Sequence, residues 1–163
     1  MRLRMMAAFV AAVVLLVPLA ANAGSSRDRA TGGGQILLGT QGAGNTVAFT
    51  AQGTSQLATG QVQFVDRSAG RGRLQTTFHG IVQCLRVESA GDVGMAKISG
   101  VNRDTGQPFE LFVVDNGEGA KATGADMVTF QEADDVSCEN EDDDDDDAMT
   151  VLARGNAQVY DAP

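Results

Sequence analysis

The sequence is poor in the residues on which most catalytic and cofactor sites are built. Its 163 residues include no Trp, one Tyr, one His and two Cys. Two Cys and one His are too few for a closed zinc site of four such ligands, and the scarcity of Trp and Tyr removes the usual aromatic platforms for sugars. The only His, His79, is accompanied by no Gly-x-Ser-x-Gly nucleophile motif. We therefore expect no enzymatic activity, no catalytic residues and no cofactor other than the weakly bound calcium considered below.

Long apolar runs are also missing after residue 23. The only such run extends from Met5 to Leu19, after Arg2 and Arg4, and the small-residue pattern Ala21–Asn22–Ala23 follows it. This order is typical of a secretory signal peptide, with cleavage expected after Ala23. The run is shorter than the roughly 20 residues of a membrane-spanning helix, and an uncleaved N-terminal anchor is the alternative. We expect a secreted or extracytoplasmic protein with no membrane span after cleavage.

Basic residues are absent from one strongly acidic segment and balance the acidic residues elsewhere in the mature chain. Residues 132–147 hold eleven acids and no base, whereas the rest of the chain after residue 23 has ten of each. The leader carries two arginines, so its removal takes the formal net charge from −9 to −11. An isolated acidic block repels phosphates, and nucleic acid is therefore excluded as a partner.

The two cysteines left in an exported chain favour a disulfide between Cys84 and Cys138. The alternative is a pair of free thiols.

Short alternating patterns take the place of helical ones. Apolar and polar residues alternate from Val47 to Ala51 and again from Gly60 to Asp66, which indicates strands. The longest β-type run, Phe109 to Val114, stops before Asn116–Gly117, a pair that favours a tight turn. Twenty Gly and only three Pro suit many such turns. We predict an all-β fold, a mostly antiparallel sandwich or flattened barrel of about eight to ten short strands.

The domain organisation that follows from these patterns is simple. Residues 1–23 are the signal peptide, and residues 24–34, rich in Gly and Ser, are expected to be a flexible lead-in. Residues 35–163 form a single β domain that carries the acidic loop at 132–147.

Four segments together resemble a small exported bacterial all-β domain that occurs alone or appended to larger surface proteins. They are GQVQFVDR (60–67), FHGIVQCLRV (78–87), VVDNGEGAKATGADMV (113–128) and RGNAQV (154–159). The resemblance covers nearly all of the mature chain. It implies no assigned activity and no catalytic residues, and the acidic run departs from the group's pattern.

Carboxylates near turns are candidate ligands for calcium. Calcium takes six to eight oxygen ligands, and two groups of acids could supply them, although neither fits the EF-hand spacing. The alternatives are a turn with solvated charges for the first group and a disordered loop for the second. The candidate ligands are Asp115, Glu118 and Asp126 in the first group and Asp142, Asp143 and Asp144 in the second.

Three functions therefore compete. The first is an exported non-enzymatic β-scaffold, a binding or structural module for an unknown protein or cell-surface partner, which predicts an exposed apolar patch or sheet edge. The second is a calcium-dependent extracellular domain, whose melting temperature would rise with calcium. The third is a small carboxylate hydrolase, which predicts two close carboxylates in a cleft or a paired His79. We expect the first.

Overall fold

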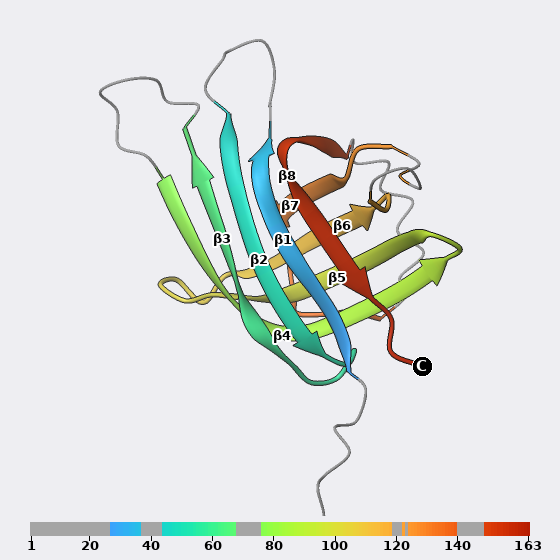
Figure 1. The fold of residues 1–163 in the computed structure, drawn as a ribbon. Helices are drawn as coiled ribbons and strands as arrows, with labels where there is room; N and C mark the ends of the chain where they lie inside the picture. Colours follow the sequence, from blue (N-terminus) through green and yellow to red (C-terminus); the bar gives the residue numbers. More distant parts are fainter. Residues whose placement is uncertain (1–26, 37–43, 68–75, 119–121, 123, 140–148) are drawn as a thin grey trace, which may run out of the picture.

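Antiparallel strands account for nearly all of the regular structure. The computed structural model describes residues 27–36, 44–67, 76–118, 122, 124–139 and 149–163. Each strand pairs with the next in sequence and the first pairs with the last, so the sheet closes into a barrel (Figure 1). The predicted all-β, antiparallel fold is confirmed. Within the described residues the strands are β1 (Asp28–Ile36), β2 (Asn45–Gly53), β3 (Ala58–Asp66), β4 (Thr76–Ala90), β5 (Val93–Asn102), β6 (Pro108–Asp115), β7 (Met127–Glu132) and β8 (Thr150–Tyr160).

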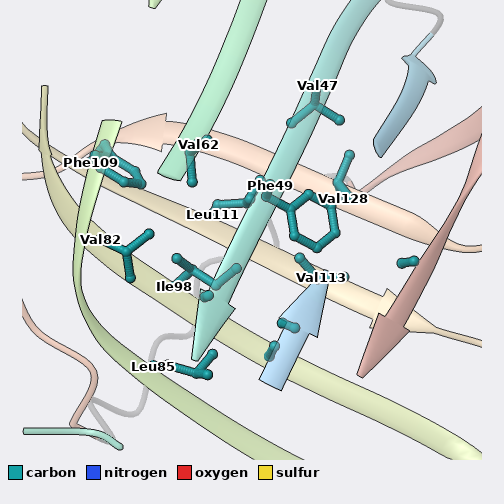
Figure 2. Close-up of a cluster of buried hydrophobic side chains, with 14 of the residues drawn as sticks. Val47, Phe49, Val62, Val82, Leu85, Ile98, Phe109, Leu111, Val113 and Val128 are labelled. Atoms are coloured by element: carbon teal, nitrogen blue, oxygen red, sulfur yellow. The ribbon is translucent and has the colours of Figure 1, made fainter. Parts of the chain in front are cut away.

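Strand alternation fills the interior of the barrel with apolar side chains. In β2, Val47, Phe49 and Ala51 are each 2% exposed, while the residues between them face outward. The interior side chains from different strands converge on one cluster (Figure 2). Its largest fully buried members are Phe109, Leu85, Ile98, Leu111, Val62, Val113 and Val128.

Phenylalanine rings gather at one end of the interior. Phe64 stacks on Phe130 with ring centroids 5.0 Å apart, and Phe78 meets both Phe130 and Phe109 edge-on at 4.8 and 5.2 Å. Such ring pairs add to the stabilisation from apolar burial. All four rings come from the ends of strands that meet the loops following β3, β5 and β7.

The lead-in predicted for residues 24–34 is wrong from Asp28 onward, because β1 begins there. Its glycines lie in a strand and not in a flexible linker. A Cβ atom added to Gly34 would lie 2.3 Å from the Arg154 carbonyl oxygen, and one added to Gly32 would lie 2.5 Å from that of Asn156. Glycine is required here because β1 and β8 approach too closely for a side chain on that face.

Two further boundaries differ from the sequence prediction. Thr150–Ala153 and Ala157–Tyr160, which the turn-favouring pair Gly155–Asn156 separates in the sequence, belong to the one strand β8. The Asn116–Gly117 turn does form, with a positive φ of 83° at Gly117, but it opens a connection that reaches β7 only at Met127. Among the described residues, no helix is long and apolar enough to cross a membrane.

Candidate functional site

The junction between β7 and β8 is the weakest ladder of the barrel. Only two residue pairs join these strands, Met127 with Val151 and Val128 with Thr150. The rest of β8 pairs with β1 on one side, from Leu152 to Tyr160. The N–H groups along the other edge of β8 therefore need acceptors that β7 does not supply.

Two carboxylates supply those acceptors. Asp126, which is 7% exposed, accepts from the Ala157 N–H at 2.7 Å and from the Asn116 N–H at 3.0 Å. Asp115 accepts from the Val159 N–H at 2.9 Å. The carboxylates thus take the place of strand carbonyls and close the barrel where β7 falls short.

Asp115 also stabilises the predicted turn at Asn116–Gly117. Its second oxygen accepts from the Gly117 N–H at 2.8 Å, the contact two residues on by which aspartate starts a turn.

A third carboxylate joins the same loop to the outer face of β8. Glu118 Oε1 accepts from Asn156 Nδ2 and from Gln158 Nε2, each at 2.8 Å. These two amides lie two residues apart and so share one face of the strand. The amide of Gln158, and next that of Asn156, lowers the pKa of Glu118 below its ordinary value of 4.5, because both hydrogen bonds favour the carboxylate.

We expect the stabilising effect of Glu118 to depend on pH. Its pKa is lowered in the folded state, so its contribution is present above about pH 4.5 and is lost as the pH falls through the folded pKa. The melting temperature of Glu118→Ala should therefore lie below that of the wild type at pH 6 and converge with it in acid. Thermal melts from pH 3 to 7 measure this, with the exposed Asp134→Ala as control. A gap that stays constant or widens in acid would contradict the assignment.

The loop and β8 enclose a groove of about 460 Å³. Its floor is the outer face of the β1–β8 ladder, where Arg29 pairs with Tyr160 and Thr31 with Gln158. Asp115, Gly117 and Glu118 form its wall. The side chain of Tyr160 is 56% exposed. Sequence reasoning missed Arg29, Gln158 and Tyr160, because their shared face follows from the pairing of the first strand with the last.

The predicted disulfide is present. Cys84 on β4 is bonded to Cys138, with a Cα–Cα distance of 6.0 Å. The Ala133 N–H donates to the Pro108 carbonyl oxygen at 3.0 Å, and Cys138 Sγ lies 3.7 Å from the Lys97 carbonyl oxygen. Residues 133–139 therefore cross the outer surface from β7 over β6 and β5 to β4. A disulfide suggests an oxidising environment, in agreement with the expected export.

A nearly buried ion pair lies on the outer face that this segment crosses. Lys97 Nζ is 3.0 Å from Glu110 Oε1, and each side chain is 11% exposed. Gln131 Nε2 donates to the other Glu110 oxygen at 3.3 Å, and the Phe112 ring lies 5.3 Å from Lys97 Nζ. These contacts satisfy both charges at low exposure, as a buried pair requires.

An apolar row crosses the outer face of the four strands β5 to β8. Met95 pairs with Val114, Val114 with Met127, and Met127 with Val151. Directly paired residues place their side chains on the same face. Met95 and Val151 are 39% and 47% exposed. On β4 the row ends at Glu88, which pairs with Met95 and contacts Arg86.

His79 lies on the surface beside an acid and an amide. Its Nδ1 is 3.9 Å from Asp104 Oδ2, and its Nε2 is 3.3 Å from Gln63 Nε2. The His79 and Asp104 side chains are 38% and 59% exposed. If Asp104 oriented the His79 ring, Nε2 would be the general base. The group beside Nε2 is the Gln63 amide, whereas nucleophilic catalysis needs a hydroxyl or thiol at that place.

The structure brings Asp115, Glu118 and Asp126 together at the β7–β8 junction, but both carboxylate oxygens of Asp115 and Asp126 and one of Glu118 already accept the protein hydrogen bonds described above. Among the described residues, no group of three or more His, Cys, Asp or Glu side chains is placed to hold a metal ion. Asp142, Asp143 and Asp144 lie outside the described residues. Calcium binding by either group stays a prediction.

No protein-family model, no curated protein and no solved structure matches the chain.

Proposed function

We propose that the chain is an exported, non-enzymatic binding module whose barrel presents one outer face to a protein partner. The apolar row Met95–Val114–Met127–Val151 is the observation that carries this proposal. Isolated apolar residues are common on protein surfaces, but contiguous apolar patches mark interaction sites. Four neighbouring strands contribute one side chain each here, and the charged pair Arg86–Glu88 borders the row. An apolar centre with a polar rim is the usual anatomy of a protein interface.

The means by which the barrel is held together support a scaffold more than a catalyst. The carboxylates of Asp115 and Asp126 are used to close the barrel, and the disulfide joins the segment after β7 to β4. A glycoside hydrolase needs one carboxyl group with a raised pKa as its general acid. Glu118, which lines the groove, has a lowered pKa instead.

We expect a photocrosslinking amino acid at Val151 to capture one discrete partner protein in the cells that export the chain. The same residue at Gln63, exposed on the outer face of β3, is the matched control and should capture nothing. Met95→Ser in the Val151-labelled chain should weaken capture roughly fivefold, because truncating an apolar contact at an interface costs about 1 kcal/mol. Equal capture from both positions, no capture at all, or indifference to Met95→Ser would refute the proposal.

A further inference from the structure

The groove beside β8 has a fixed floor and a fixed wall. Its floor consists of alternate residues of two paired strands, so the side chains of Arg29, Thr31, Gln158 and Tyr160 project from the same face. Its wall is the loop from Asp115 to Glu118. The wall is joined to the floor by the Asp115 contact with Val159 N–H and by the two amide contacts of Glu118. Because both sides are held by hydrogen bonds, a ligand would meet a preorganised site.

Charges of opposite sign line this groove without meeting. Within the part of the chain that the structure describes, the Arg29 side chain forms no ion pair or hydrogen bond, although Glu118 and Asp115 line the same groove. Both amide donors of Glu118 go to Oε1, and Oε2 accepts none from the described residues. The groove therefore offers an exposed guanidinium at one place and a carboxylate oxygen at another.

We propose that this groove binds a small zwitterion, an amino acid or short peptide that bridges these two charges. The carboxylate of the ligand meets the Arg29 guanidinium, whose planar fork of N–H donors suits a carboxylate. The ammonium of the ligand meets Glu118 Oε2. The exposed ring of Tyr160 lies beside Arg29 in the β1–β8 register and can cover the ligand's alkyl carbons or face its ammonium.

The size and composition of the groove fit this class of ligand. A volume of about 460 Å³ lies within the range of small-molecule sites. A purely anionic ligand would be repelled by Glu118 and Asp115, and a purely cationic one would be repelled by Arg29. The site is separate from the apolar row of the proposed function, because none of the four residues of that row lines the groove. Either proposal can therefore fail without the other.

Titration of the ¹⁵N-labelled protein, with its disulfide formed, tests the inference by amide chemical shifts. We expect L-alanyl-L-alanine to shift the amides of residues 117–118 and 156–160. The N-acetylated dipeptide lacks the ammonium, and the dipeptide amide lacks the carboxylate. Each should bind at least about tenfold more weakly, since each loses one charge-assisted contact. Arg29→Gln should weaken binding of the dipeptide to a similar extent.

The matched control is Arg103→Gln, which removes another exposed arginine, one whose side chain contacts the neighbouring Asp104 and does not line the groove. It should leave the affinity for the dipeptide unchanged. If either capped dipeptide bound as tightly as the free dipeptide, or if neutral maltose shifted the same amides, the zwitterion assignment would be overturned. The absence of shifts at saturating dipeptide would overturn the site.

Discussion

Replacing Asp126 with alanine is expected to lower the melting temperature by about 10 °C. The nearly buried carboxylate accepts two backbone N–H groups, from Ala157 on β8 and from Asn116 in the loop. Hydrogen bonds to a charged group contribute about 1.5–3 kcal/mol each, and the donor left without a partner adds to the cost. A total loss of about 3 kcal/mol corresponds to that shift in a domain of this length. The loss is large because only two residue pairs otherwise join β7 to β8.

Two variants separate this role from a general effect of removing charge. Asp135→Ala removes an exposed acid and should change the melting temperature by no more than about 1 °C. Asp126→Asn keeps one acceptor but turns an NH₂ group toward one N–H donor, so it should lose at least half as much stability as Asp126→Ala. Calorimetry at pH 7 measures all three variants. If Asp126→Ala melted with the wild type, the carboxylate would have no part in closing the barrel.

Much of the fold could be predicted from the sequence because its strands alternate. In β2 a period of two places Val47, Phe49 and Ala51 inside, as the structure does. The buried face of β6, from Phe109 to Val113, follows from the same rule. The expectation of export and an even cysteine count were enough to predict the Cys84–Cys138 bond.

Strand boundaries were less predictable where local signals and long-range packing disagree. The glycines of β1 look like a linker, but Gly32 and Gly34 are needed because β8 lies too close for side chains, and Gly33 because β2 does. A bulge between Val82 and Cys84 shifts the register of β4. Strict alternation would place Ile81 with Leu85, yet Ile81 is 44% exposed and Leu85 is fully buried. A single extra residue reverses the faces, and the sequence alone carries no sign of it.

The candidate site shows the same limit. The sequence identified Asp115, Glu118 and Asp126 as acids around one turn, and calcium binding was one hypothesis for such a group. Asp115 and Asp126 instead accept from N–H groups on the edge of β8 that faces away from β1, and these groups lack strand partners because β7 begins only at Met127. A shortage of backbone acceptors depends on the pairing of strands that are distant in sequence, so it could not be inferred from the spacing of the acids.

Removing the disulfide is expected to have the largest effect of all. The bond joins residues 54 positions apart, and opening a loop of that length costs about 4 kcal/mol in the chain-entropy model, or about 12 °C in melting temperature. The variant with both Cys84→Ala and Cys138→Ala should show this loss and should not respond to a reductant. The wild type should melt at nearly the same reduced temperature once a thiol reductant opens the bond. Residues 133–139 should then become a site of limited proteolysis, because the hydrogen bonds of Ala133 with Pro108 and with the Gln107 side chain hold only the start of this segment. A loss below about 1 kcal/mol, or resistance of the reduced segment to protease, would mean that other contacts hold this segment on the barrel.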